Sequence, residues 1–303
     1  MNSERVWPAG DSEFHPRRVI RLRHAMSDHP LLQLAALQRL GEKFEALGNG
    51  LVKFVRTGAT SADPLEVHTR SDRGLSVSEA FARIAEPGSW VSLYSVQVDP
   101  DYRAMIHEVV DSTASWAEAA DPGRFEYDGF IFVSSAPSAT PFHFDRENNF
   151  FLQIHGRKRL SVWDPADRQV VPEIELEQKI GGRADVSTAR FDGSYFQRAI
   201  VNEELRPGEG VYMPSASGHT TNTEALPLGT DDTYSISIGV VFYTRATRRA
   251  AYAYALNDHL RRFGFHPRPP YVSPLLDTLK YPVGRSLVLA KRYLRGAVIP
   301  PGM

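Results

Sequence analysis

The fold of this chain is decided by residues 129–163, which read GFIFVSSAPSATPFHFDRENNFFLQIHGRKRLSVW. Four runs rich in β-branched and aromatic residues follow one another here, and turn residues separate them. They are Gly129–Ser135, Thr140–Asp145, Asn149–His155 and Lys158–Trp163. Similar runs flank the segment at Trp90–Gln97, Phe196–Asn202, Gly210–Met213 and Tyr234–Tyr243. Eight short strands predict a mainly β fold whose antiparallel sheet is closed or doubled.

Helical periodicity replaces this β texture toward both ends of the chain. Leucines recur every three or four residues between Pro30 and Leu47, and an apolar stripe runs between Arg245 and Phe263. We therefore expect flanking helices and three parts. These are a helical and mixed flank at 1–89, the β core at 90–244 and a helical C-terminal extension at 245–303.

The C-terminal extension differs from the rest of the chain in charge. It holds eleven Lys and Arg against two Asp and Glu, whereas the first 244 residues hold 24 against 34. The two parts are electrostatically complementary, which favours docking of the extension on its own core or on a second copy as a homodimer. Complementarity of this kind disfavours nucleic acid as the partner.

The composition excludes several classes of site. With 35 basic and 36 acidic residues in 303, no global charge attracts the chain to nucleic acid or to an anionic membrane. The absence of Cys excludes disulfides, thiolate zinc sites, iron–sulfur clusters and cysteine nucleophiles. The N-terminal segment lacks the apolar stretch of a signal peptide, and no segment approaches the roughly 20 apolar residues of a membrane span. We expect a cytoplasmic protein with no membrane partner.

A candidate metal site begins with His143 and Asp145. Side chains two residues apart in a strand point to the same face, so an imidazole nitrogen and a carboxylate oxygen can reach one point. His219 is the third candidate, because a turn after Pro214 delivers it and a barrel can bring distant strands face to face. Two His and one carboxylate form the facial triad that leaves three positions open on Fe(II). We predict that these three residues bind one catalytic metal ion.

Residues 129–163 resemble the cupin-like branch of the JmjC oxygenases, the family that includes the asparaginyl hydroxylase of the hypoxia-inducible factor. The matching residues are Thr140-Pro141, His143-x-Asp145 and the run from Asn149 to Arg159. The resemblance implies a double-stranded β-helix core (a jelly roll, or cupin) that holds Fe(II), with 2-oxoglutarate as cosubstrate and O2 as oxidant. It implies a dioxygenase that hydroxylates a protein, peptide or small-molecule substrate.

The same resemblance implies which residues bind the cosubstrate. Lys158 matches the lysine that receives the far carboxylate of 2-oxoglutarate, and strand alternation places it on the opposite face from Arg157 and Arg159. The other matching positions are Thr140, Tyr94 and Asn149. One position departs from the pattern, since Gly239 stands where the asparaginyl hydroxylase has an asparagine on the last barrel strand.

Two other hypotheses are compatible with the sequence. In the first, a metal-binding cupin senses a ligand without turnover, for instance as a transcriptional regulator whose basic extension contacts DNA. Release of succinate distinguishes the oxygenase from this sensor. In the second, the protein is structural and its triad has lost the metal; the intact triad and Lys158 argue against it.

Overall fold

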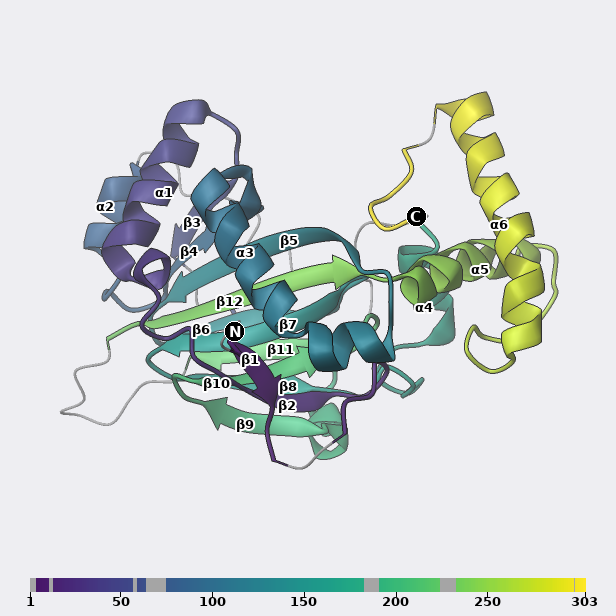
Figure 1. Ribbon diagram of the computed structural model, residues 1–303, viewed down its shortest axis with the longest axis horizontal. Helices are drawn as coiled ribbons and strands as arrows, with labels where there is room; N and C mark the ends of the chain where they lie inside the picture. The colour runs from purple at the N-terminus through teal and green to yellow at the C-terminus, as the bar shows by residue number, and fades with distance from the viewer. Residues whose placement is uncertain are drawn as a thin grey trace.

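The computed structural model describes residues 4–10, 13–56, 59–63, 75–182, 191–223, 233–296 and 298–303. Its strands are β1 (Val6–Pro8), β2 (Ile20–His24), β3 (Val52–Arg56), β4 (Ser89–Leu93), β5 (Phe125–Ser134), β6 (Ser138–Phe144), β7 (Asn148–His155), β8 (Lys158–Val162), β9 (Val201–Leu205), β10 (Glu209–Met213), β11 (Gly218–Thr223) and β12 (Ser235–Tyr243). They form an eight-stranded sheet in the order β1-β2-β10-β7-β12-β5-β4-β3 and a four-stranded sheet in the order β6-β11-β8-β9 (Figure 1). All the paired strands run antiparallel, as the sequence predicts for a jelly-roll core.

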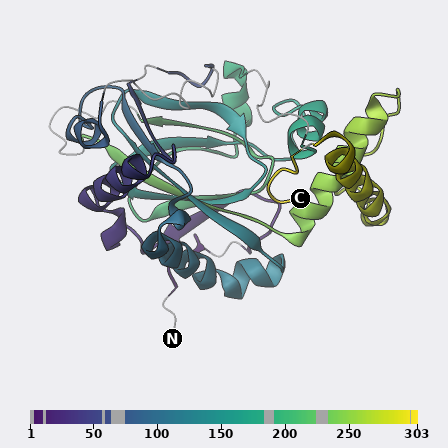
Figure 2. The same cartoon turned by 90° about the horizontal axis from the view of Figure 1, so that it is seen from above.

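The helices flank this strand assembly. They are α1 (Leu34–Leu47), α2 (Val77–Ala82), α3 (Pro100–Ser112), α4 (Glu173–Ile180), α5 (Arg245–Arg261) and α6 (Pro274–Arg295), with short turns η1 (Pro30–Leu32), η3 (Val96–Val98), η4 (Ala114–Glu118) and η5 (Gly193–Arg198). Figure 2 shows α1 and α3 on one side of the strands and α5 and α6 at the far end. Within the described ranges, no helix is both long enough and apolar enough to cross a lipid bilayer.

The eight-stranded sheet has an apolar outer face and a mixed inner face. Phe150, Leu152 and Ile154 of β7 join the large core cluster that the first three helices cover. Because side chains alternate along a strand, the intervening positions face the four-stranded sheet. There Phe151 meets Leu160 of β8 in a smaller apolar cluster. The polar side chains described below share this interior.

Two strand predictions from the sequence need correction, and one strand of the candidate site was not predicted. The predicted strand Trp90–Gln97 ends early at Leu93, because Ser95 takes a left-handed conformation (φ 49°) and turns the chain into η3. The first three residues of the predicted strand Phe196–Asn202 belong to the 3-10 helix η5, whose first turn Asp192 caps, and β9 begins only at Val201. Strand β11 was not predicted, since its sequence, GHTTNT, lacks apolar alternation.

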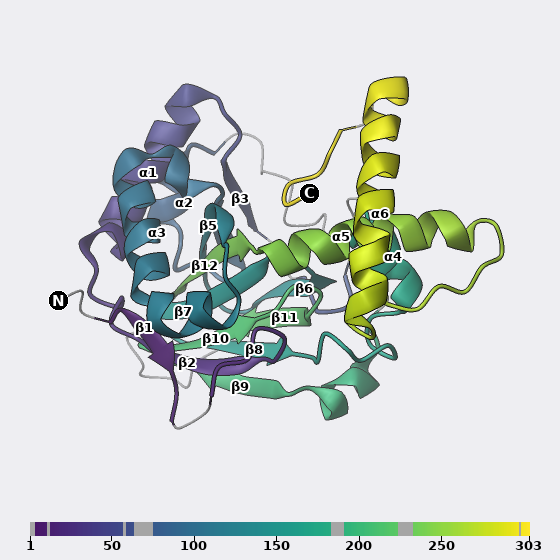
Figure 3. The same ribbon diagram turned by 45° about the vertical axis from the view of Figure 1, so that its right-hand side comes forward.

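The C-terminal extension packs on its own chain. Ala250, Ala251 and Tyr254 of α5 join a cluster with Phe144 and Trp163 of the barrel. Helix α6 folds back on α5, as Figure 3 shows, and Tyr252 packs there against Tyr281 and Val288. The other side of α6 leaves apolar side chains exposed, among them Leu275, Leu279, Val283 and Leu294.

Candidate metal centre

Two histidines lie side by side on neighbouring strands of the four-stranded sheet. His143 of β6 and His219 of β11 are direct Cα partners in the antiparallel pairing. Their ring centroids lie 4.1 Å apart, with the ring planes inclined at 54°. Directly opposed residues of an antiparallel pair have Cβ atoms about 5 Å apart. Both imidazoles can therefore reach one point.

Asp145 completes the cluster from the position just after β6. Its Oδ2 lies 3.9 Å from Nε2 of His143 and 3.5 Å from Nε2 of His219. One possible ligand atom from each of the three residues lies within 4.8 Å of the other two. The backbone N–H of Ala216 donates to the carbonyl of Asp145 at 2.9 Å, which fixes the strand end. The structure thus places the three residues together, and their role as metal ligands stays a prediction.

The backbone holds the second nitrogen of each imidazole. Nδ1 of His143 lies 2.8 Å from the carbonyl oxygen of Pro141, and Nδ1 of His219 lies 3.0 Å from that of Ser217. A carbonyl oxygen only accepts, so each Nδ1 carries the proton and donates it. The lone pair then lies on Nε2, the atom nearest Asp145. This arrangement is the one that orients metal-binding histidines.

Burial and nearby charge keep His143 and Asp145 in the protonation states that bind a cation. Burial, reinforced by the neighbouring His219, lowers the pKa of His143 to about 3. Burial by itself would raise the pKa of Asp145, but His143, His219 and Lys179 outweigh this effect and lower it. Neutral imidazole and ionised carboxylate are the forms that coordinate a metal.

A bulge brings Thr140 to the same side as His143. The two residues are three positions apart, so strict alternation would place them on opposite faces. His219 is opposite His143 whereas Thr221 is opposite Thr140, so three steps along β6 match two along β11. The hydroxyl of Thr221 donates to the Thr140 hydroxyl at 2.9 Å. Phe142, in the bulge, packs away from the interior against Trp163.

Lys158 is a buried cation inside the barrel. The residue is 2% exposed, and its Nζ donates to Oγ of Ser237 at 3.2 Å and lies 5.0 Å from the centre of the Trp90 ring. No carboxylate pairs with this ammonium group in the part of the chain that the structure describes. Burial lowers the pKa of Lys158 to about 7. A buried ammonium group without a counter-ion is expected to receive an anionic ligand.

Tyr94 lies on the wall next to Lys158 but does not bond to it directly. Trp90, Ser92 and Tyr94 occupy alternate positions at and after β4. The indole Nε1 of Trp90 donates to Oγ of Ser92 at 2.7 Å, and Tyr94 also hydrogen-bonds to Ser92. Burial raises the pKa of Tyr94, so its hydroxyl stays protonated. Among the described residues, neither Tyr94 nor Thr140 bonds to Lys158; Trp90 and Ser92 connect Tyr94 to Lys158.

Asn149 and Gly239 fit together on the adjacent strands β7 and β12. A Cβ atom on Gly239 would lie 3.1 Å from Oδ1 and 3.2 Å from Nδ2 of Asn149. The missing side chain at position 239 therefore makes room for the Asn149 amide. Oδ1 of Asn149 is buried and has no hydrogen-bond partner in the described part of the chain. Such an orphaned atom in a native interior calls for a bound group.

Lys179 of α4 is a second buried cation, and the sequence reasoning missed it. Its Nζ donates to the carbonyl oxygen of Phe144, which belongs to the peptide bond just before Asp145. The ammonium group also lies 4.9 Å from the centre of the Phe144 ring. The only signal in the sequence was its place beside Leu176 and Ile180, the apolar positions of a short helix.

These groups fit a divalent transition metal with a dicarboxylate beside it. Two imidazoles and one carboxylate are the donor set of non-haem Fe(II) sites, and they approach from one side. The unpaired ammonium of Lys158 faces the same interior and suits the far end of a dicarboxylate. The residues present therefore fit Fe(II) and 2-oxoglutarate.

Solved structures of YcfD from Escherichia coli resemble this structure weakly. One of them has 16% sequence identity and a TM-score of 0.44, over 91% of this chain and 65% of that chain. Another, a structure of YcfD, a ribosomal oxygenase, in complex with cobalt and succinic acid, has 16% identity and a TM-score of 0.41, over 91% of this chain and 64% of that chain. The chain spans less than two thirds of the length of these proteins. Similarity at this level carries no argument about activity.

Sequence comparison gives a firmer result for the family. No curated protein matches the chain in sequence. A family model described as a cupin-like domain matches residues 62–247, which is more than half of the chain and includes all the site residues discussed above. The chain belongs to the cupin-like domain family.

Proposed function

We propose that this protein is an Fe(II)- and 2-oxoglutarate-dependent oxygenase that hydroxylates a protein, peptide or small-molecule substrate with O2. One observation carries the proposal: the His-Asp-His cluster opens into the same barrel interior as a buried ammonium group that no carboxylate of the described chain neutralises. A metal site alone would fit many functions. A metal site beside an unpaired buried cation fits a metal that works with an anionic cosubstrate.

In this proposal, His143, Asp145 and His219 hold the metal through Nε2, a carboxylate oxygen and Nε2. The backbone acceptors at Pro141 and Ser217 keep both rings in the required tautomer. When bound, Fe(II) and 2-oxoglutarate supply the oxidative chemistry, which no side chain of the protein can perform.

The protein's own contribution is to position the cosubstrate and exclude water from it. Lys158 forms the ion pair with the far carboxylate, and its contact with Trp90 keeps that end of the pocket apolar. The Thr140 hydroxyl is held by Thr221 and offers a hydrogen bond to the same ligand. Asn149 offers its unpaired amide oxygen as a hydrogen-bond acceptor to a group bound beside the metal. Tyr94 completes the wall through Ser92.

The substrate enters, in our proposal, through a hollow of ≈ 620 Å³ at the end of the barrel. Glu147, which lies two residues after Asp145, lines this hollow. Val241, which lies two residues after Gly239 on the same face of β12, lines it as well. The C-terminal residues Ile299 and Met303 form its rim. A volume of this size admits an amino-acid side chain or a small molecule.

The exposed apolar face of α6 supports a proposed homodimer through the C-terminal helix. Leu275, Leu279 and Val283 are exposed although they are large and apolar. A second copy of the same helix could cover them. Light scattering of the parent and of Leu279→Glu tests this, and a parent that is monomeric at all concentrations contradicts it. A cytoplasmic location stays a proposal from the sequence.

The oxygenase is tested by turnover. The protein with Fe(II), O2 and 2-oxoglutarate should release succinate, and candidate substrates should increase the rate. Binding of metal and 2-oxoglutarate without succinate release would instead favour the alternative, a cupin that senses a ligand.

A further inference from the structure

A second cavity lies behind the metal centre, where the N-terminal segment, two barrel loops and α5 meet. Its volume is ≈ 210 Å³. Ser215 and Ala216 form part of its wall, and Ala216 is the residue whose N–H holds the carbonyl of Asp145. The cavity is lined by none of the residues assigned above to metal or cosubstrate.

Two side chains that line this cavity have a hydrogen-bonding group without a partner among the described residues. Tyr254 is 3% exposed, and its hydroxyl makes no hydrogen bond in the part of the chain described here. Asn148 is 2% exposed; its Oδ1 accepts from the N–H of Ser215 and the hydroxyl of Tyr212, but its Nδ2 donates to no described residue. Buried polar atoms are nearly always paired, so Nδ2 of Asn148 points to a bound molecule, and the Tyr254 hydroxyl lines the same space.

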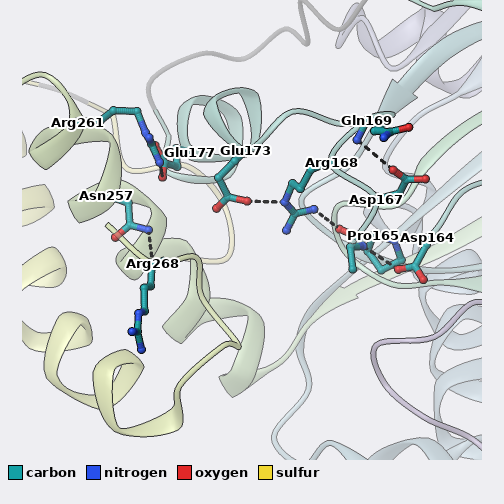
Figure 4. A network of polar contacts seen from close by, with 11 residues as sticks. Asp164, Pro165, Asp167, Arg168, Gln169, Glu173, Glu177, Asn257, Arg261 and Arg268 are labelled. Atoms are coloured by element: carbon teal, nitrogen blue, oxygen red, sulfur yellow. Dashed lines mark hydrogen bonds and ion pairs between the residues drawn. The ribbon is translucent and has the colours of Figure 1, made fainter. Parts of the chain in front are cut away.

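A positive charge also lines the cavity. Arg17 is an exposed residue whose guanidinium lies 4.1 Å from the centre of the Tyr271 ring and forms no ion pair with any described residue. Arg168, on the opposite wall, is neutralised by Glu173 (2.5 Å) and held by the carbonyl of Pro165 (2.7 Å), as Figure 4 shows. Arg17 is therefore the cation available to a ligand of this cavity, whereas the charge of Arg168 is already paired.

One acidic residue lines the same space. Asp121 hydrogen-bonds to the side chain of Thr244, and burial raises the pKa of its carboxyl group. Burial outweighs the Thr244 hydrogen bond, which by itself favours the ionised form, and the higher pKa weakens the opposition of Asp121 to an anion. Burial also raises the pKa of Tyr254 and of Tyr271, so both hydroxyls remain protonated donors at neutral pH.

We propose that this cavity binds a small oxyanion, with Arg17 supplying the charge and Tyr254 and Asn148 supplying hydrogen bonds. Carboxylate and phosphate groups both match this set of donors. The cavity is smaller than the pockets that hold drug-sized ligands, so the ligand is a small molecule or a single anionic group. The proposal does not depend on oxygenase activity.

The test is calorimetric titration of the full-length, metal-free protein at constant ionic strength. The probes are inorganic phosphate in one series and acetate in another. The informative variants are Arg17→Gln and Tyr254→Phe. Their matched controls are Arg18→Gln, the adjacent exposed arginine, and Tyr252→Phe, a buried tyrosine on the same helix that packs on α6.

At least one probe should bind, and its identity shows whether the site prefers phosphate or carboxylate. Arg17→Gln should weaken binding at least tenfold and Tyr254→Phe several-fold, while both controls bind like the parent. Lys158→Met should also bind like the parent, because the proposed cosubstrate pocket is a separate site. The proposal is overturned if neither probe binds at millimolar concentration. It is equally overturned if Lys158→Met abolishes binding while Arg17→Gln and Tyr254→Phe leave it unchanged.

Discussion

His143 and His219 face each other directly across the β6–β11 pair, and His219 is at the same time opposite Val162 of β8. Strand β11 is therefore paired with a neighbouring strand on both sides at His219, the candidate ligand that is farthest in sequence from the other two. Hydrogen bonding on both sides fixes the backbone of that residue. This rigidity is what a preorganised metal site needs, since ligands must be held close to their final geometry.

The assignment of Lys158 predicts a separation of metal and cosubstrate binding. Lys158→Met removes the ammonium group and keeps most of the apolar stem. We expect 2-oxoglutarate binding to fall at least a hundredfold, because a charged hydrogen bond to a carboxylate is lost. Affinity for Co(II) should stay within a factor of about three of the parent. Equal affinity of parent and variant for 2-oxoglutarate would exclude Lys158 from the pocket.

Burial of Lys158 also predicts a pH dependence of stability. Its pKa is about 7 in the folded protein, against roughly 10.4 for an unfolded chain. Between these values the unfolded state binds more protons, so the free energy of unfolding rises with pH by up to about 1.4 kcal/mol per unit. Urea denaturation of the metal-free parent between pH 7 and 10 should show this additional rise, and Lys158→Met should lack it. Parallel pH profiles would contradict the depressed pKa.

The contact between Gly239 and Asn149 predicts a coupled pair. Gly239→Ala places a Cβ atom 3.1 Å from Oδ1 of Asn149 and should cost roughly 1–2 kcal/mol of stability. In the Asn149→Ala background the same substitution should cost much less, which a double-mutant cycle measures. Gly193→Ala is the control, since a Cβ atom there meets nothing within 4 Å. Additive effects of the two changes would remove the steric explanation.

The ion pair between α4 and α5 predicts how strongly the C-terminal extension is fixed. Glu177 is fully buried, and both of its oxygens accept from Arg261, at 2.6 and 2.7 Å. Glu177→Gln leaves Arg261 without its counter-ion and should lower the free energy of unfolding by about 2–4 kcal/mol. Arg21→Gln, which breaks the exposed pair with Glu203, should cost less than about 1 kcal/mol. A similar cost for both variants would contradict this assignment.

Strand periodicity and the His-x-Asp pattern predict much of the fold and the candidate site. The strands around residues 129–163 follow from β-branched runs between turns, and the common face of His143 and Asp145 follows from alternation. The turn after Pro214 suggests His219, whereas only the family likeness adds Lys158. The structure buries both residues, and their roles stay predictions.

Other features depend on packing that a sequence does not display. Thr140 and His143 share a face only because β6 contains a bulge, and the bulge is visible only in the pairing with β11. Strand β11 itself carries polar residues because it faces a polar interior, so the usual apolar alternation is missing. Lys179 reaches Phe144 across 35 residues of chain, through the docking of a short helix. Contacts of this kind arise from tertiary structure and not from local periodicity.

The most direct test of the central claim is anaerobic titration of the purified protein with Fe(II) and then with 2-oxoglutarate, followed by visible absorption. The account predicts one Fe(II) per chain and a new charge-transfer band on adding 2-oxoglutarate. Both should be lost in His219→Ala and kept in His155→Ala, whose ring stacks on Tyr234 away from the cluster. Stoichiometric binding of Fe(II) and 2-oxoglutarate that survives in His219→Ala would contradict the account.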